Sequence, residues 1–434
     1  MKENYVFTNT TILTLDDTAP VRYNACLVTE DGRISYLGQE LPPQLPARHK
    51  RIDGRNLLLC PGLVNAHTHT PMTLLRGFSD DCSLEQWLSH IWPAEEALTE
   101  DDYYYGSLLG IAEMLAYGTT SVSDMYRSSH TILRSAVDSG IKATICESIT
   151  CPADQDPALL PSVRRSIDLI HTYNGWDRGR IRCDTSIQSV FQTTPALWEF
   201  IGDVAAREHI GIHTHICETR KEVQNCIQNY GCTPIAALQR AGVFRSRVAA
   251  AHGIYVSEED LEILSSSRAV VVHDPCSNLK CGCGIANLKP FIQRGIPVAL
   301  GTDGVCSNNS GDMFETMKFT ALIQKGIHED PTFADAGQVL SMAVQGGLLS
   351  QGREGESGIL APGRDADIIA LDLSHPGLSP LTSPVSNLVY AAHGNHVAMT
   401  MVRGNILYYK GEYMTIDLEK VKYEVKKCME RLLL

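Results

Sequence analysis

The sequence lacks the long apolar run, the basic excess and the glycine-rich loops that mark several common classes of protein. Nothing in its 434 residues approaches the roughly 18–20 consecutive apolar residues of a membrane helix. Asp and Glu number 50 against 37 Lys and Arg, a net charge of −13, which disfavours nucleic acids and anionic membranes as partners. Neither the Rossmann nor the P-loop glycine fingerprint follows a strand-like run, which argues against both of those nucleotide-binding folds.

The chain also lacks the features of a secreted protein. Its first segment, MKENYVFTNTTILTLDD, has no apolar core and no small-residue cleavage site, so we expect no signal peptide. The 14 cysteines are scattered through apolar stretches, as is typical of reduced thiols in the cytoplasm. Cys276, Cys281 and Cys283 form the tightest group. Without a second cluster at zinc-finger spacing, they are interpreted as loop-lining thiols, with a metal or redox role as the alternative.

The two ends of the chain have the same pattern. Residues 1–58 and 361–434 alternate apolar and polar side chains, as half-buried strands do, and the second segment ends in a helical pattern. Asp31-Gly32, Gly404-Asn405 and Gly411 are hairpin turn signals. We therefore predict one small β-sandwich built from both termini.

The middle of the chain, residues 59–360, alternates apolar runs with amphipathic segments. Eight runs resemble strands: LLLCPGLVNAHTH, TTSVSDM, ATICESI, IRCDTSI, GIHTHIC, VAAAHG, AVVVHDP and PVALGTDG. Six segments between them resemble helices: YYYGSLLGIAEMLAYG, SHTILRSAVDSG, TPALWEFIGDVAAREH, TRKEVQNCIQNYG, SEEDLEILSSS and NLKPFIQRG. Eight repeated β-α units predict an α/β fold, a (β/α)₈ barrel with any active site at the carboxyl ends of its strands.

Polar residues gather at the predicted strand ends. They are His67 and His69 on the first strand, His215 and Glu218 on the fifth, His252 on the sixth and Asp303 on the eighth. One such residue alone is usually structural, but together they would lie on one rim of the barrel. Imidazoles and a carboxylate suit a divalent metal, with zinc favoured and iron as the alternative. Such a metal lowers the pKa of a bound water, and Glu218 is positioned to move the proton.

The chain resembles the metal-dependent amidohydrolase superfamily over nearly its whole length. The motifs are PGLVNAHTHTPMTLLRG, HTHICET, AAHGIYVSEEDLEIL, HDPCSNLKCGCGIANL, LGTDGVCSNNS and APGRDADIIALDL. They are most similar to the branch of 5′-methylthioadenosine/S-adenosylhomocysteine deaminases and related chlorohydrolases. The resemblance implies a distorted barrel with a composite β-sandwich, and a homo-oligomer.

The resemblance also assigns roles to residues at the strand ends. It implies that one zinc or iron is held by His67, His69, His215 and Asp303. Glu218 would be the proton shuttle, His252 would orient the attacking water or the tetrahedral intermediate, and Asp303 would share in proton transfer. Relatives with two metals carry a Lys on the fourth strand, and IRCDTSIQSVF has none, so one metal is expected.

Three further positions bear on the substrate. Glu95 falls where relatives hold ribose hydroxyls, although Glu96 beside it leaves the register open and a solvated helix-start carboxylate is the alternative. Gln188 replaces a His that contacts the purine, and Gln can still exchange hydrogen bonds with a heterocycle. Glu147 replaces an Arg that binds an amino-acid carboxylate, and would repel that tail unless Arg164 or Arg165 compensates. Drift of loop residues is the alternative explanation for both replacements.

The sequence therefore predicts a hydrolytic deaminase that releases ammonia from an amino-substituted nitrogen heterocycle. The favoured substrate is an adenosine derivative such as 5′-methylthioadenosine, S-adenosylhomocysteine or 5′-deoxyadenosine, with water as co-substrate. An aminohydrolase or chlorohydrolase of guanine, pterin, triazine or pyrimidine type is the alternative. A cyclic-amide hydrolase and a non-catalytic scaffold are disfavoured, because the fourth-strand Lys is missing and the ligand set is complete.

Overall fold

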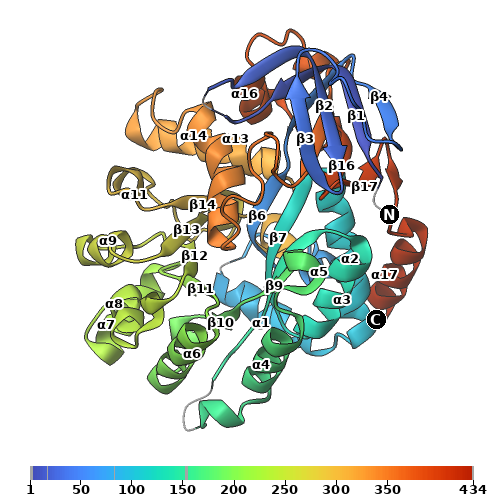
Figure 1. Cartoon of the computed structure of the whole chain (residues 1–434). Helices are drawn as coiled ribbons and strands as arrows, with labels where there is room; N and C mark the ends of the chain where they lie inside the picture. Colours follow the sequence, from blue (N-terminus) through green and yellow to red (C-terminus); the bar gives the residue numbers. More distant parts are fainter. Residues whose placement is uncertain (1–2, 17, 83, 152–154, 433–434) are drawn as a thin grey trace.

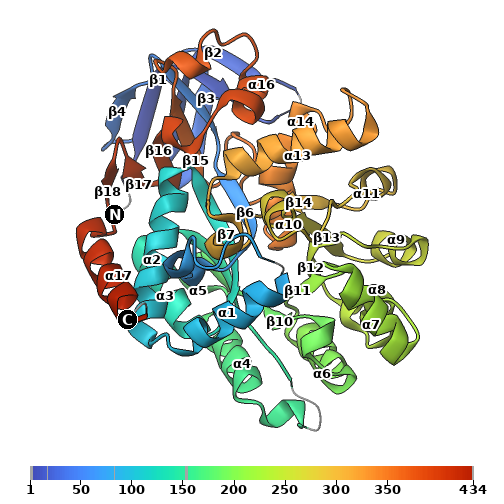
Figure 2. The same cartoon turned by 180° about the vertical axis from the view of Figure 1, so that it is seen from behind.

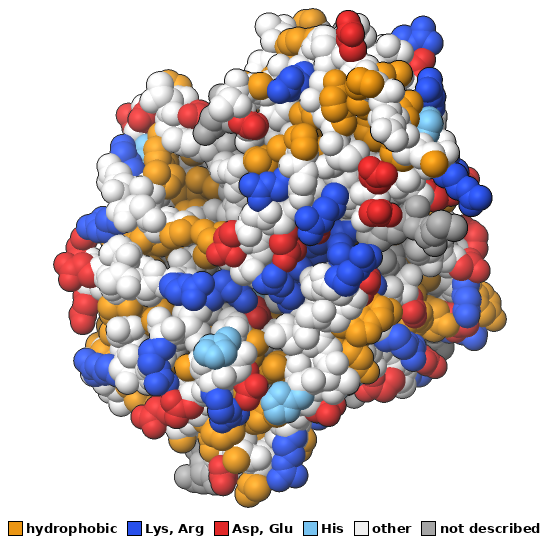
Figure 3. All heavy atoms as spheres, in the orientation of Figure 1, with side chains coloured by type: hydrophobic (Ala, Val, Ile, Leu, Met, Phe, Trp, Pro, Cys, Tyr) orange, Lys and Arg blue, Asp and Glu red, His pale blue; other side chains and the backbone are white. Residues whose placement is uncertain are grey.

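The structure, a computed structural model, describes residues 3–16, 18–82, 84–151 and 155–432. Figures 1 and 2 show two parts, a β-domain to which segments from both ends of the chain contribute and a larger barrel of strands and helices, with the C-terminal helix beside the barrel. Acidic and basic side chains are interspersed over the face seen in Figure 3. No described helix is long and apolar enough to cross a membrane.

The β-domain is one nine-stranded sheet that folds around an apolar core of its own. Its strands are β1 (Tyr5–Leu13), β2 (Val21–Glu30), β3 (Arg33–Gly38), β4 (Lys50–Asp53), β5 (Leu57–Pro61), β15 (Ile368–Asp372), β16 (Val397–Val402), β17 (Asn405–Tyr409) and β18 (Glu412–Tyr413). They follow the order β18-β17-β16-β15-β5-β1-β2-β3, with β4 beside β1. The predicted hairpin turn at Asp31-Gly32 joins β2 to β3, with φ of 50° and 88°. The predicted terminal β-domain is therefore confirmed.

The chain leaves this sheet three residues later than expected. LLLCPGLVNAHTH was predicted as one strand, with the domain boundary at residue 58. The backbone N–H of Gly62 donates to Asp367 in the β-domain (3.1 Å), whereas that of Leu63 donates to Gly118 beside the barrel (3.0 Å). A side chain at Gly62 would collide with that of Thr120. Because Gly62 has no side chain, one apolar run can form a strand of the β-domain before it and a strand of the barrel after it.

Eight parallel strand positions form the barrel, as predicted. They are β6 (Leu63–Thr68), β7 (Thr119–Tyr126), β8 (Lys142–Glu147), β9 (Ile181–Cys183) continued by β10 (Thr185–Ile187), β11 (Ile212–Ile216), β12 (Val248–His252), β13 (Ala269–His273) and β14 (Val298–Leu300). Two parallel sheets, β6 to β9 and β10 to β14, meet at the break between β9 and β10. On the other side the N–H of Asp303 donates to the carbonyl of His67 (3.0 Å), which joins the β14 end to β6.

Helices cover the outside of the barrel (Figure 1). The longer ones are α1 (Leu84–Glu96), α2 (Glu100–Ala116), α3 (Ser129–Ser139), α4 (Pro161–Tyr173), α6 (Pro195–Glu208), α7 (Arg220–Tyr230), α8 (Pro234–Arg240), α9 (Glu258–Ser265), α13 (Met313–His328) and α17 (Leu418–Leu432). Shorter ones are α5 (Trp176–Gly179), α10 (Pro275–Lys280), α11 (Lys289–Gln293), α12 (Val305–Asn308), α14 (Ala336–Ser341), α15 (Gly347–Ser350) and α16 (Pro384–Ser386). Each of the six predicted segments contains a helix, whereas α1, α4, α8 and α13 lie outside them.

A buried lysine fixes the β-domain to the barrel. Lys142, at the start of β8, is fully buried, and its Nζ lies 2.6 Å from Asp367 and 3.1 Å from Asp365. Both carboxylates belong to the segment that leads into β15. Because a buried ammonium needs such partners, this network holds the two parts in one fixed arrangement.

Candidate active site

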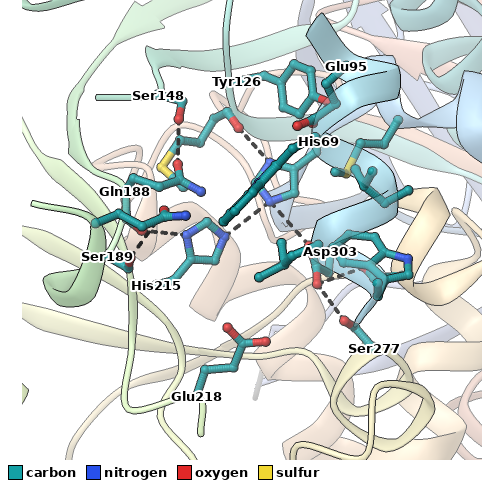
Figure 4. Close-up of a pocket in the computed structure, with 18 of the residues that line it drawn as sticks. His69, Glu95, Tyr126, Ser148, Gln188, Ser189, His215, Glu218, Ser277 and Asp303 are labelled. Carbon is teal, nitrogen blue, oxygen red and sulfur yellow. Dashed lines mark hydrogen bonds and ion pairs between the residues drawn. The ribbon is translucent and has the colours of Figure 1, made fainter. Parts of the chain in front are cut away.

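The residues predicted for the metal site lie together at the carboxyl ends of the barrel strands, and Figure 4 shows His69, His215 and Asp303 among them. His67 is within β6, His215 is within β11 and His252 ends β12, while His69 and Asp303 follow β6 and β14. The backbone turns sharply at two of these ends, where φ is 74° at His252 and 59° at Asp303. Non-glycine residues seldom adopt this left-handed conformation, and such strain tends to cluster at functional sites.

Three imidazoles and a carboxylate converge on one point. Nε2 of His69 lies 3.2 Å from Nε2 of His215 and 3.3 Å from Oδ1 of Asp303. Nε2 of His67 lies 3.5 Å from the same oxygen. Four potential ligand atoms therefore surround a common centre.

The other ring nitrogens determine which atoms face that centre. Nδ1 of His69 donates to the carbonyl of Met125 (2.6 Å), and Nδ1 of His215 donates to the carbonyl of Gln188 (2.7 Å). With the proton on Nδ1, each Nε2 presents a lone pair, the orientation usual for metal-binding histidines. Two lone pairs 3.2 Å apart repel each other unless a cation lies between them.

Burial and charge fit a metal ion. Nε2 of His67 is buried and has no hydrogen-bond partner among the described residues. Burial holds the pKa of His67 and His215 well below the usual range, so both imidazoles are neutral. Burial would raise the pKa of Asp303, but its interactions with the His67 and His69 imidazoles hold it well below its usual range. Burial lowers the pKa of His69, but the same carboxylate outweighs this and raises it. Neutral imidazoles with an ionised carboxylate suit a divalent transition metal.

Two groups of residues, which share His67, could each hold a metal ion. His67, His69 and Asp303 form one group whose ligand atoms lie within 4.8 Å of one another, and His67, His215 and His252 form another. His252 can therefore face either a metal or the substrate from its strand end. Its Nδ1 donates to Oδ1 of Asn278 (2.8 Å), which leaves Nε2 directed toward the pocket.

Glu218 faces the same centre from just beyond β11 (Figure 4). Its Oε2 lies 3.9 Å from Nε2 of His252, and its Oε1 accepts a hydrogen bond from the Cys283 thiol (3.5 Å). Burial lowers the pKa of His252, but the nearby carboxylates of Glu218, Asp274 and Asp303 raise it to about 9. The backbone N–H of Glu218 donates to Glu222 (2.8 Å), so the turn that carries Glu218 is fixed. The carboxylate can take and return a proton beside a cationic imidazole.

A pocket of about 900 Å³, including space open to solvent, lies over these residues. Aromatic and aliphatic walls and a few polar groups are the usual lining of a small-molecule site. The lining residues are His69, Met72, Trp87, Leu88, Ile91, Trp92, Glu95, Met125, Tyr126, Arg127, Ser148, Thr150, Gln188, Ser189, Phe191, Gln192, His215, Glu218, His252, Ser277, Cys281, Asp303 and Ser307.

Glu95 is in the pocket and Glu96 is not. Both lie at the end of α1, not at a helix start, but Glu95 is buried and lines the pocket whereas Glu96 is exposed. The hydroxyl of Tyr126 donates to Glu95. Burial raises the pKa of Glu95. Of the two residues, Glu95 is therefore the one that faces the pocket.

Gln188 lies in the pocket, whereas Glu147 does not. The side-chain oxygen of Gln188 accepts a hydrogen bond from Ser148, and among the described residues nothing accepts from its amide nitrogen. Glu147 is fully buried outside the pocket lining, where Arg165 pairs with it at 2.6 Å and Ser129 donates its backbone N–H at 3.0 Å. The expectation that Glu147 contacts the substrate was wrong, because its side chain points from β8 toward α3 and α4.

Cys276 lies within α10, and Cys281 and Cys283 follow that helix; burial raises the pKa of all three thiols, so they are neutral. All 14 cysteines of the chain are free. Cys281 lines the pocket, and burial raises its pKa to about 12. Among the described residues the groups able to hold a metal are the two histidine groups, and neither includes a cysteine.

Two residues that support the ligands were not predicted. Nε2 of His213 lies 2.8 Å from Nδ1 of His67, and Asn278 orients His252. His213 carried a signal in the sequence, because it precedes His215 by two and strand side chains repeat on one face with that period. Partners of this kind fix the orientation and basicity of metal ligands.

Comparison with known proteins agrees with the site. The amidohydrolase family model matches residues 58–407. A 5-methylthioadenosine/S-adenosylhomocysteine deaminase of Acetivibrio thermocellus is 38% identical over 435 residues, 99% of this chain and 100% of that protein. A protein of the same name from Dictyoglomus thermophilum is 41% identical over 377 residues, 87% of this chain and 88% of that protein.

A solved structure shares the whole architecture. The crystal structure of an adenosine deaminase from Xanthomonas campestris with bound zinc superposes with a TM-score of 0.91 at 28% identity. The match covers 99% of this chain and 98% of that one, so barrel and β-domain are both included. The chain belongs to the amidohydrolase family.

Proposed function

We propose that the protein is a hydrolytic deaminase of adenosine derivatives of the 5′-methylthioadenosine/S-adenosylhomocysteine type. The observation that carries the proposal is the convergence of His67, His69, His215 and Asp303 beneath a pocket that Glu218 also faces. The full-length likeness to proteins named for this activity supports the choice of substrate.

One divalent metal ion, zinc in preference to iron, would be held by His67, His69, His215 and Asp303. When bound, such a metal lowers the pKa of water and stabilises negative charge on oxygen. Ser277 and Ser307 donate to the second oxygen of Asp303, at 2.5 and 2.9 Å, and so keep the first oxygen turned toward the ligand site. These contacts support Asp303 as a ligand.

The side chains around the centre would move the protons. Glu218 accepts a proton from the attacking water and delivers it to a ring nitrogen of the substrate, which makes the amino-bearing carbon electrophilic. His252, held cationic by its acidic neighbours, donates a hydrogen bond to the oxygen that gains charge. The second proton of the water then passes to the amino group, the carbon–nitrogen bond breaks, ammonia leaves, and a carbonyl remains on a ring whose nitrogen keeps the first proton. Asp303, beside the same oxygen, would share in the proton transfer.

Two pocket residues would hold the nucleoside. Glu95 would accept hydrogen bonds from two ribose hydroxyls, which its burial in the pocket and its hydrogen bond from Tyr126 support. The amide nitrogen of Gln188 is available to donate to a ring nitrogen of the heterocycle. Both would contact substrate from opposite sides of the metal site (Figure 4).

An ammonia-release screen on protein of known metal content tests the proposal. The panel is adenosine, 5′-deoxyadenosine, 5′-methylthioadenosine, S-adenosylhomocysteine, guanine, cytosine, aminotriazines and pterins. Turnover confined to adenosine derivatives would support the proposal. Turnover of another heterocycle alone would show that the substrate differs from the proposed one while the hydrolytic chemistry is as proposed. Absence of ammonia release by metal-loaded protein would refute the deaminase activity.

The resemblance also implies an oligomeric state and a cellular location for the protein. The protein is expected to be a homo-oligomer, which light scattering of the purified chain would measure. It is also expected in the cytoplasm, which fractionation of the source cells would test.

A further inference from the structure

Arg127 is a half-buried arginine at the point where the active-site pocket opens into neighbouring hollows. It directly follows Tyr126, the last residue of β7. It lines the active-site pocket itself, together with Glu95. It also lines an adjoining hollow beside Trp92, and a third beside Arg165. A molecule longer than the pocket would therefore pass its guanidinium.

The guanidinium of Arg127 has no hydrogen-bond acceptor within the described chain. No hydrogen bond or ion pair joins it to another described residue, whereas Arg165 pairs with Glu147 and Arg180 with Asp177. A guanidinium carries five N–H donors, and leaving them unmet in a half-buried position costs free energy. Acceptors supplied by a bound ligand would remove that cost.

The position of Arg127 relative to Glu95 gives the order of groups along a ligand. Tyr126 donates its hydroxyl to Glu95, and Arg127 is the next residue along the chain. Arg127 is close enough to Glu95 to lower its pKa, in opposition to burial. A nucleoside with its base at the metal site and its ribose at Glu95 would thus direct the substituent of its sugar toward Arg127.

We propose that Arg127 binds a carboxylate on the part of the substrate that extends beyond the ribose, and that it thereby selects substrates with an anionic tail. This inference rests on the proposed deaminase function and names the substrate class of the same site. The basic residue expected after the third barrel strand is instead Glu147, which is buried and bound to Arg165. Arg127, which follows the second barrel strand, lines the pocket instead.

The surroundings of Arg127 favour a carboxylate over a phosphate. The planar guanidinium fork matches the two oxygens of a carboxylate. Exposed Glu96 lines the same hollow, which disfavours a doubly charged phosphate and complements an ammonium group on the same tail. Trp92 and Phe191, 40% and 51% exposed, offer apolar surface to the linker between ribose and tail.

Arg127→Gln tests the inference on three nucleosides. These are S-adenosylhomocysteine, its carboxamide, in which the anion is replaced by a neutral group, and 5′-methylthioadenosine. We expect kcat/KM for S-adenosylhomocysteine to fall about 10–100-fold, mostly through KM, because a charge-assisted hydrogen-bonded pair is lost. For the two substrates without the carboxylate, kcat/KM should change less than about 3-fold. Arg127→Lys should restore part of the loss, because it keeps the charge without the fork.

Arg164→Gln is the matched control, since Arg164 is an exposed residue of α4 that lines none of the hollows described above and the charge change is the same. A similar loss on all three substrates would overturn the inference, as would an unchanged kcat/KM for S-adenosylhomocysteine. Calorimetric binding of the three nucleosides to wild type and Arg127→Gln gives a readout independent of turnover. Absence of any turnover of 5′-methylthioadenosine by the wild type would instead refute the proposed function. If the wild type turns over 5′-methylthioadenosine but Arg127→Gln changes kcat/KM equally for charged and uncharged substrates, only the role of Arg127 would be refuted.

Discussion

Replacing Glu218 by Gln separates proton transfer from every other role of this side chain. The amide keeps an oxygen that can accept a hydrogen bond from the Cys283 thiol, as Oε1 does in the wild type at 3.5 Å. It removes the carboxylate, 3.9 Å from Nε2 of His252, that would take the proton from the attacking water. We expect kcat/KM to fall by about 10²–10⁴, the usual contribution of a positioned acid–base group, or about 3–5 kcal/mol in barrier height.

Metal content and folding should not change with activity in this variant. Glu218 belongs to neither group of residues able to hold a metal. An isosteric change at a pocket surface should alter the free energy of unfolding by less than about 1 kcal/mol. The assay is ammonia release from 5′-methylthioadenosine at equal metal content, measured by mass spectrometry. Glu259→Gln, with the same charge change at an exposed position on α9, is the control. Normal turnover by Glu218→Gln would refute the proton-shuttle role.

Three further predictions concern the metal, the pH dependence and the joint between the two parts. Asp303→Asn, which the left-handed backbone at φ 59° tolerates, should lose bound metal and activity together, and full metal occupancy after dialysis would contradict its role as a ligand. Burial raises the pKa of Glu222 from 4.5 to about 7, so the unfolded chain ionises first as the pH rises through that window. The wild type should therefore lose up to about 3 kcal/mol of stability relative to Glu222→Gln over this range, and a pH-independent difference in urea unfolding would argue against a protonated Glu222. Lys142→Met should cost about 3–5 kcal/mol in urea unfolding because Asp367 is left buried without its cation, and a loss below about 1 kcal/mol would show that the network is not needed.

Much of the architecture could be predicted because local patterns determine it. The alternation of β and α segments implies parallel strands, and their carboxyl ends form one rim. His67 and His69 could be placed on the same side because strand side chains alternate with a period of two. The same rule would have placed His213 beside His215.

The residues that the sequence misplaced depend on tertiary contacts. In β8 both faces are buried, so nothing in the run ATICESI distinguishes the face toward the pocket from the face toward the helices. Ser148 faces the pocket, and Glu147 therefore points outward to Arg165. Glu95 and Glu96 could not be told apart for a similar reason, since the orientation of α1 against the barrel decides which of them is buried.

The proposed reaction is the hydrolytic removal of an amino group from an adenosine derivative at this site. The most direct measurement incubates zinc-loaded protein with 5′-methylthioadenosine in ¹⁸O-labelled water and follows ammonia together with the mass of the purine product. We expect one ammonia for each nucleoside consumed, and a product whose amino group is replaced by labelled oxygen. Unchanged nucleoside with stoichiometric zinc bound, or a product cleaved at any other bond, would contradict it.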